Sequence, residues 1–256
     1  MTDKPLRILL TNDDGIHAPG LKVLENIARQ LTDDIWIVAP ETEQSGASHS
    51  LTMNRPLKLR KLNDNKYTVN GTPSDCVLMA CHEILRDHRP DLVLSGVNYG
   101  ANIAEDISYS GTVSAASEAA MLNIPAIALS LKVTKEIPKW ATAQHYAPDI
   151  IRKLLEVEWE RKVLINVNFP DAIVDSVTGV KLAKQGLREW QQRLTPTFDP
   201  FGGRLHWIHY KNDKSTVQDG TDIAAIRDNA ITITPLKLTR NDPGMFEKMA
   251  KMFPQA

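Results

Sequence analysis

Residues 6–15 decide the fold of this chain, and they read Leu6-Arg7-Ile8-Leu9-Leu10-Thr11-Asn12-Asp13-Asp14-Gly15. The apolar run over 6–11 is typical of a buried parallel strand, and the polar cluster that follows is typical of a turn. From Pro19 to Leu31 apolar residues recur at helical spacing, and a second apolar run covers 35–39. This strand–helix–strand unit predicts the start of a parallel α/β sheet.

The same pattern continues to residue 170. The expected strands are 56–61, 66–69, 92–94, 124–131 and 163–169, and the expected helices are 74–87, a segment opening after Ser110–Thr112, and 140–156. We therefore predict an α/β core over residues 1–170. Cys76 and Cys81 lie in the first of these helices, point in different directions and are expected to be unpaired.

After Pro170 the pattern becomes richer in strands and turns. Strands are expected at 177–183, 204–210 and 230–235, with a short helix near 244–252. We predict a β-rich extension over 171–256, with one segment returning to the core and a projecting arm over about 185–210. Four aromatic residues lie in or beside this arm, namely Trp190, Phe198, Phe201 and Trp207. Because a free loop would expose them, we expect an intersubunit contact that gives a homodimer or homotetramer, the alternative being that the arm folds back on its own domain.

Charge limits the partners. The 256 residues include 30 Lys and Arg against 31 Asp and Glu, a formal net charge of -1. Proteins that bind duplex nucleic acid usually carry a basic excess, and proteins of the membrane surface a basic stripe, so both classes are disfavoured. No apolar run approaches the roughly 18 residues of a membrane span, and the first residues lack a signal-peptide core. A cytoplasmic location is the expectation.

Polar residues follow three different buried strands, at 12–15, 40–50 and 95–112. The carboxyl ends of parallel strands lie along one edge of a sheet, so these segments are expected to meet there. Asp13 and Asp14, joined by amide and hydroxyl oxygens, would suit a hard cation such as Mg²⁺ or Mn²⁺; the alternative is a solvated turn with a helix cap. Ser110, Gly111 and Thr112 would offer amides and hydroxyls to a phosphate at a helix start, although such residues also serve as simple caps.

These motifs together resemble the SurE family, the stationary-phase survival proteins and 5′-nucleotidases. The resemblance runs through nearly the whole chain and rests on an ordered set of segments: Thr11–Gly15, Gln44–Ala47, Asn70–Val77, Pro90–Asn98, Tyr109–Val113, Asn166–Pro170, Asp199–Pro200, Gly220–Asp222 and Thr232–Leu236. It implies a Rossmann-like three-layer core with a smaller C-terminal extension used in oligomerisation. It also implies metal-dependent hydrolysis of nucleoside 5′-monophosphates, with 3′-nucleotides and short polyphosphate as further substrates.

The resemblance also assigns residues. One divalent ion per subunit would be held by Asp13, Asp14, Ser45 and Asn98, and the phosphate by Asn12, Gly46, Ser110, Gly111 and Thr112. Asp13 and Asp14 would be the catalytic pair that supports attack of an activated water on phosphorus, and Asp13 is favoured for the proton transfer.

Three departures from the family pattern stand out, at Gln44, Ala104 and Ser114, where relatives often carry Arg, Gly and Gly. None is a proposed metal ligand. His17 and His49 are read as helix-entry and loop residues, with substrate contact or acid–base chemistry as the alternative.

Two other functions compete with the nucleotidase. A phosphatase with an Asp nucleophile usually shows Asp-x-Asp, which residues 12–14 do not offer. A nucleotide- or metal-binding sensor would bind at the same residues without turnover. A dinucleotide oxidoreductase is disfavoured because no Gly-x-Gly-x-x-Gly follows the first strand.

Overall fold

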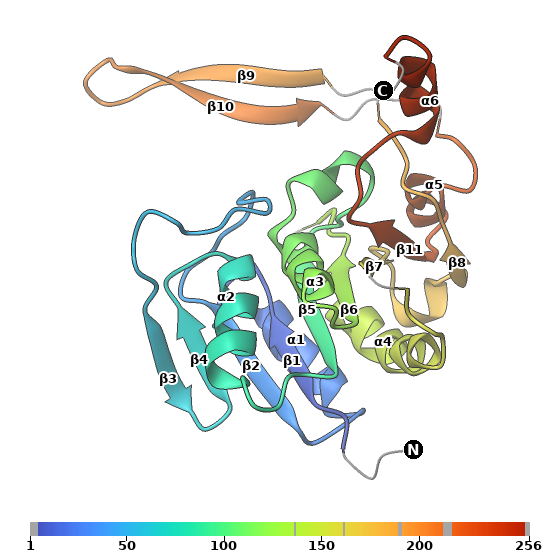
Figure 1. The fold of residues 1–256 in the computed structure, drawn as a ribbon. Helices are drawn as coiled ribbons and strands as arrows, with labels where there is room; N and C mark the ends of the chain where they lie inside the picture. The colour runs from blue at the N-terminus through green and yellow to red at the C-terminus, as the bar shows by residue number, and fades with distance from the viewer. Residues whose placement is uncertain (1–4, 136, 161, 189–190, 212–216, 254–256) are drawn as a thin grey trace.

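The computed structural model describes residues 5–135, 137–160, 162–188, 191–211 and 217–253. Its centre is a sheet of nine strands in the order β3-β4-β2-β1-β5-β6-β7-β11-β8, crossed on both faces by helices (Figure 1). The strands are β1 (Ile8–Thr11), β2 (Ile35–Pro40), β3 (Leu59–Asn63), β4 (Lys66–Val69), β5 (Leu92–Tyr99), β6 (Ala126–Leu131), β7 (Val163–Phe169), β8 (Val180–Leu182) and β11 (Ile231–Lys237).

The six central strands, from β4 to β7, are all parallel to their neighbours. This confirms the α/β core. At its edges the sheet departs from parallel pairing, because β3 is antiparallel to β4 and β11 is antiparallel to β7. Both departures come from strands reached by a hairpin or by the C-terminal segment rather than by a helical crossover.

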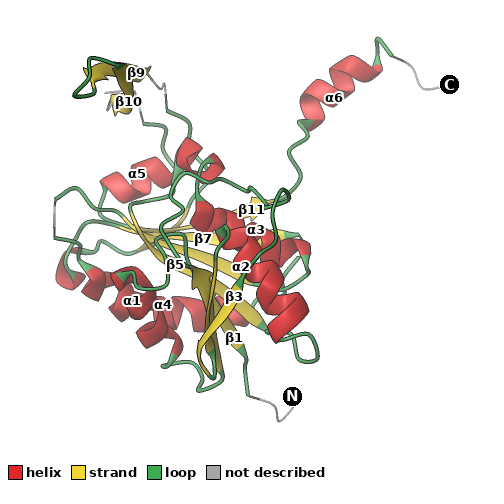
Figure 2. Cartoon of the chain, turned by 90° about the vertical axis from the view of Figure 1, so that its left-hand side faces the viewer, coloured by secondary structure: helices red, strands yellow, loops and turns green. Residues whose placement is uncertain are grey.

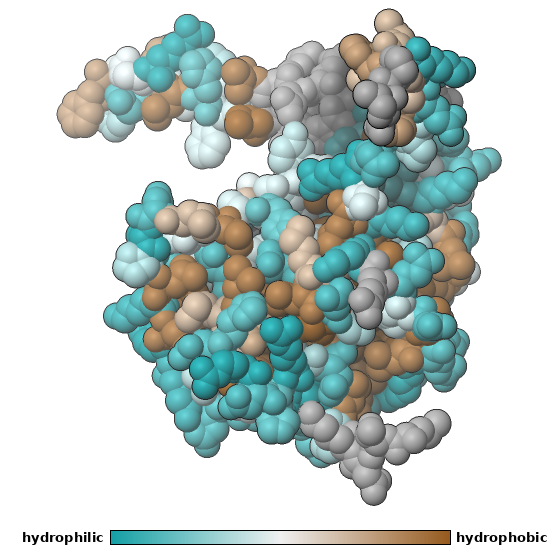
Figure 3. Space-filling model, viewed as in Figure 1, coloured by the Kyte–Doolittle hydropathy of each residue, from teal (hydrophilic) through white to brown (hydrophobic). Residues whose placement is uncertain are grey.

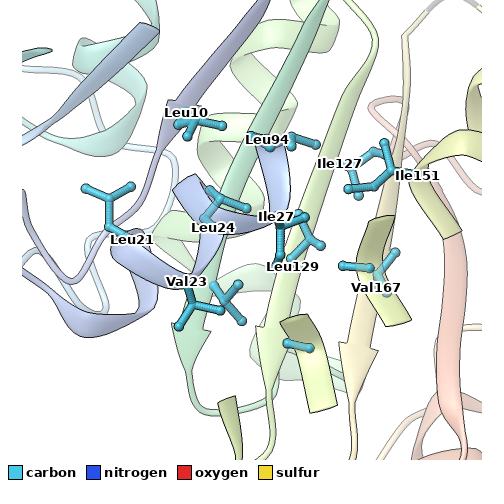
Figure 4. Close-up of a cluster of buried hydrophobic side chains, with 14 of the residues drawn as sticks. Leu10, Leu21, Val23, Leu24, Ile27, Leu94, Ile127, Leu129, Ile151 and Val167 are labelled. Atoms are coloured by element: carbon cyan, nitrogen blue, oxygen red, sulfur yellow. The ribbon is translucent and has the colours of Figure 1, made fainter. Parts of the chain in front are cut away.

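Two helices cover each face. One face carries α1 (Pro19–Ala28) and α4 (Trp140–Leu155); the other carries α2 (Pro73–Met79) and α3 (Gly111–Met121). Leu21, Leu24 and Ile27, spaced along one side of α1, pack against strand residues such as Leu94 and Leu129 (Figure 4). This is the helical apolar spacing read from the sequence, and it buries the side chains that hold α1 on the sheet.

The C-terminal part contributes to the sheet and also leaves it. β11 lies between β7 and β8 in the main sheet, and α5 (Asp222–Arg227) packs against β11. β9 (Gln191–Phe198) and β10 (Arg204–Lys211) form a separate antiparallel hairpin that stands clear of the body, and α6 (Pro243–Ala250) projects at the end of a linker (Figures 1 and 2). No helix of the described chain is long and apolar enough to cross a membrane.

Several expected elements have other bounds. The helix expected over 74–87 ends as an α-helix at Met79 and continues as a π-helical turn, Ala80–Ile84, whose wide hydrogen bond from Leu85 N to Ala80 O brings Leu85 into the core. The strand expected at 92–94 extends to Tyr99, because Asn98 and Tyr99 pair with β6. The segment expected as polar and turn-rich before 204 contains β9, and α5 was not foreseen. Cys76 and Cys81 are both buried and unpaired, as predicted.

Candidate metal and phosphate site

Asp13 and Asp14 lie where three segments meet, directly after β1. The backbone N–H of Gln44 donates to the carbonyl of Asp13 at 2.7 Å, and the backbone N–H of Tyr99 donates to Asp14 Oδ2 at 3.3 Å. Thr112, at the start of α3, donates to the Asp13 carboxylate. The structure therefore brings together the three polar segments that the sequence placed after three separate strands.

The N-terminus of α3 holds Asp13 through two hydrogen bonds. Thr112 Oγ1 donates to Asp13 Oδ1 at 2.5 Å, and Thr112 N donates to Oδ2 at 3.1 Å. Gly111 makes this approach possible, since a Cβ at this position would lie 2.7 Å from Asp13 Cβ. The positive end of the helix dipole and two donors thus hold a buried carboxylate in one orientation.

The two carboxyl groups resist ionisation in this setting. Burial raises the pKa of Asp13, although the hydrogen bonds from Thr112 oppose that effect. Burial, followed by the neighbouring charge of Asp13, raises the pKa of Asp14 to about 6. A cation between the two groups would offset both causes, because it replaces lost hydration and neutralises the mutual repulsion.

The other proposed ligands lie around this pair. Asn98 is the next-to-last residue of β5, and its Nδ2 donates to the carbonyl of Gly100 at 2.9 Å, so Oδ1 is the atom it can offer to a cation. Asn12 Nδ2 donates to the carbonyl of Gly15 at 2.9 Å, while Asn12 Oδ1 is buried and has no hydrogen-bond partner in the described chain. Ser45 is exposed, one residue after the Gln44 amide that holds Asp13.

The donor set fits a hard divalent cation. It consists of carboxylate, amide and hydroxyl oxygens, which Mg²⁺ and Mn²⁺ prefer. Among the described residues, no group of three or more His, Cys, Asp or Glu side chains is placed to hold a metal. A cation at Asp13 and Asp14 would therefore depend on neutral oxygens such as those of Ser45 and Asn98.

The proposed phosphate segment, Ser110–Thr112, also supports Asp13. Thr112 directs its hydroxyl and its N–H to Asp13. Ser110 Oγ accepts from Val113 N at 3.0 Å as the N-cap of α3, which leaves its own O–H hydrogen available to donate. Gly46 adopts a φ of +77° in the loop that carries Ser45. Ser110 is therefore the side chain of this segment best placed to meet a phosphate oxygen.

His49 and one of the departures, Ser114, lie beside this segment. His49 Nε2 is 2.8 Å from Oε2 of Glu118, a buried residue of α3. Ser114 Oγ donates to the carbonyl of Ser110 at 2.6 Å. Both His49 and Ser114 line a cleft of about 460 Å³ between α3 and the segment after β11.

Two other residues singled out in the sequence lie elsewhere. Gln44 Nε2 donates to Thr42 Oγ1 at 3.3 Å, and His17 is exposed on the turn before α1.

Sequence reasoning missed the residues of the C-terminal part that hold the loop leading to α3. Asp222 Oδ2 accepts a hydrogen bond from Ala104 N, and Arg188 forms a bidentate ion pair with Asp106. Both Gly220–Asp222 and Asn102–Asp106 were visible as motifs. Their meeting was not, because more than a hundred residues separate Ala104 from Asp222.

This fold, with polar side chains gathered at the carboxyl ends of parallel strands, defines an α/β protein of the class that binds small ligands at that edge. The family model described as "Survival protein SurE" matches residues 8–192. This chain belongs to the SurE family.

Its relatives share most of its length. The protein named 5′-nucleotidase SurE of Paramagnetospirillum magneticum is 53% identical over 240 residues, covering 93% of this chain and 92% of its own. The one of Parvibaculum lavamentivorans is 52% identical and covers 92% of this chain and 86% of its own. The crystal structure of the SurE protein from Aquifex aeolicus superposes with a TM-score of 0.84 at 36% identity, over 96% of this chain and 99% of that one.

Proposed function

We propose that this chain is a 5′-nucleotidase that hydrolyses nucleoside 5′-monophosphates to nucleoside and phosphate with the help of one divalent cation. Family membership and relatives of about half-identical sequence that carry the name 5′-nucleotidase support the nucleotidase class. The observation that carries the cation is the Asp13–Asp14 pair, two adjacent carboxyl groups with raised pKa at the junction of three segments.

Asp13, Asp14, Ser45 and Asn98 would hold the cation. Bound there, it would polarise the phosphate ester and lower the pKa of a water molecule at neutral pH. Thr112 and the α3 N-terminus keep Asp13 oriented, and Ser110 would donate its hydroxyl hydrogen to a phosphate oxygen. Asn12 and Gly46 would complete the phosphate-binding part of the site. Asp13 would take or give the proton that is transferred during hydrolysis. Nucleoside 3′-monophosphates and short polyphosphate present the same terminal phosphate and are proposed as further substrates.

The decisive test is phosphate release from a panel of nucleoside 5′- and 3′-monophosphates and polyphosphate, with Mn²⁺ or Mg²⁺ and with chelator. We expect the wild type to be active only with metal, and Asp13→Asn or Asp14→Asn to lose at least about 100-fold in kcat/KM. Asp64→Asn is the matched control, because Asp64 is exposed and pairs only with a surface lysine among its described contacts.

Other results would redirect the assignment. Undiminished turnover in either variant would remove the carboxylates from the metal site. Tight nucleotide binding with no phosphate released under any condition would favour a sensor. A phosphorylated protein trapped during turnover would favour an aspartyl nucleophile instead.

We also propose that the chain forms a homodimer or homotetramer through the β9–β10 hairpin. Leu194, Phe198, Phe201, Trp207 and Ile208 are all more than half exposed on this hairpin, and hydrophobic residues alternate with hydrophilic ones along it (Figure 3). An isolated two-stranded hairpin is marginally stable in water, so a partner surface would supply the missing burial. Trp190, which the sequence also placed in this arm, lies outside the described residues.

A further inference from the structure

Asp222 is a buried carboxylate that the proposed chemistry does not use. It opens α5 and is fully buried. Its Oδ1 accepts from the N–H groups of Gly186 at 2.9 Å and Ile223 at 2.8 Å, and its Oδ2 accepts from Ala104 N at 2.9 Å. One side chain thus ties the helix start to the chain before the hairpin and to the loop after β5.

Ala104 is held in a conformation that its own side chain disfavours. Its φ is +53°, in the left-handed region where glycine is at ease and alanine is not. The N–H of Ala104 is bound by Asp222, and its carbonyl accepts from Gln185 Nε2 at 2.9 Å. Both polar groups of this strained residue are therefore fixed by side chains from the C-terminal part of the protein.

The loop that begins at Ala104 leads directly into the site. It forms a short 3₁₀-helix, Ala104–Ser108, and continues through Tyr109 to Ser110, the N-cap of α3. Along this path the hydroxyl of Ser48 donates to the carbonyl of Ser108 at 2.7 Å, and the N–H of Ser48 donates to the carbonyl of Tyr109 at 3.2 Å. The path of this loop therefore sets the position of Ser110 and also of the loop that carries Ser45.

We propose that Asp222 and Gln185 are positioning residues that hold Ala104 in its left-handed conformation and thereby fix Ser110 and the Ser45 loop around the bound phosphate. This inference rests on the proposed function for what the site binds. Contacts from 185 and 222 offset the steric cost that alanine, unlike glycine, bears in this conformation. Gly186 is part of the arrangement, because a Cβ there would lie 3.0 Å from Asp222 Oδ1.

The test compares Asp222→Asn, Gln185→Met and Ala104→Gly, alone and in the double variant Asp222→Asn with Ala104→Gly. Asn keeps the size of Asp but cannot accept from all three N–H groups. Asp228→Asn, at the other end of the same helix on the surface, is the matched control. We call the contacts of Asp222 and Gln185 with Ala104 the clamp. Gln185 is itself exposed, so its variant tests the clamp even where Asp222→Asn folds poorly.

We expect kcat/KM to fall about 10- to 100-fold in Asp222→Asn, and less in Gln185→Met. The nucleotide KM and the inhibition constant of inorganic phosphate should rise by the same factor. A merely structural defect would instead lower kcat, through fewer active molecules, and leave both constants unchanged. Ala104→Gly should restore most of the loss in the double variant, because glycine keeps the left-handed conformation without the clamp.

Amide hydrogen exchange gives a second readout that needs no activity. Residues 104–110 should exchange faster in Asp222→Asn and Gln185→Met than in the wild type, with the central strands unchanged. Unchanged phosphate inhibition together with no rescue by Ala104→Gly would overturn the proposal. If the wild type released no phosphate at all, the proposed function would fail, while the exchange experiment would still decide whether the clamp exists.

Discussion

Asp14 is the residue at which charge and stability are most directly linked. Its pKa in the folded chain is about 6, raised from 3.8 by burial and by Asp13. Because the folded-state pKa is the higher one, the contribution of this group to stability is fully present below about pH 4 and is lost as the pH rises through 6. At neutral pH the metal-free protein therefore holds an ionised carboxylate that costs free energy.

Asp14→Asn should accordingly stabilise the metal-free protein at pH 7, by about 1–2 kcal/mol after allowance for the partial exposure of the group. The gain should vanish below about pH 4, where Asp14 is protonated in both folded and unfolded chains. Urea unfolding in the presence of chelator at the two pH values measures this difference. A variant that is less stable than the wild type at pH 7 would contradict the sign.

Gly111 tests the close contact between α3 and Asp13. In Gly111→Ala the new Cβ would lie 2.7 Å from Asp13 Cβ and 2.9 Å from Asp13 Oδ2. We expect a loss of about 1–3 kcal/mol in the free energy of unfolding and a loss of activity of about 100-fold or more, because Asp13 must shift. Gly244→Ala in α6 is the control, since the nearest atom to its added Cβ, Asp242 Oδ1, is 3.6 Å away.

At the scale of elements, the β9–β10 hairpin allows the proposed subunit contact to be assigned to one face. Leu194 lies opposite Ile208, whereas Leu205 and Trp207 pair with threonines on the other face. One double variant, Leu194→Lys with Ile208→Glu, places charges on the first face, and another, Leu205→Lys with Trp207→Glu, places them on the second. We expect the variant on the contact face to lower the molar mass measured by light scattering, and the variant on the other face to leave the mass unchanged. The arm hypothesis fails if neither pair changes the mass.

The sequence allowed the central elements to be predicted because their signals are local. Ile8–Thr11, Ile35–Pro40 and Val163–Phe169 are apolar runs, and α1 shows helical spacing after Pro19. The sequence predicts a shorter strand than β5, because Ser95, Gly96 and Asn98 are residues typical of turns. In the structure, burial and pairing with β6 extend the strand to Tyr99. The short helix α5 lacks enough residues for a periodic pattern.

The same difference between local signals and long-range contacts decides which site residues could be predicted. Asp13, Asp14 and Asn98 could be grouped from the rule that parallel strands end at one edge. No such rule indicates that Thr112 would turn its hydroxyl to Asp13, or that Asp222 would reach Ala104. Such contacts depend on how segments far apart in sequence pack, which side-chain pattern alone does not encode.

At the scale of the whole molecule, the proposed cation should act as a stabilising ligand. With Mn²⁺ at about 100 times its Kd, the free energy of unfolding should rise by about 2.7 kcal/mol at pH 7. At pH 5, one unit below the pKa of Asp14, protons should weaken the apparent affinity about tenfold. Thermal unfolding with Mn²⁺ and with chelator at both pH values measures the shift, and an equal gain at pH 5 and pH 7 would contradict a metal bound by Asp14.

The contact between Ala104 and Asp222 also has a consequence for how the protein matures during synthesis. Chains emerge from the ribosome N-terminal end first and tend to fold as they emerge. Asp13 follows β1 and Asn98 lies in β5, so both emerge more than a hundred residues before Asp222. The nascent protein should therefore present the carboxylates and the start of α3 early, and acquire the final shape of the phosphate site only after Asp222 has emerged.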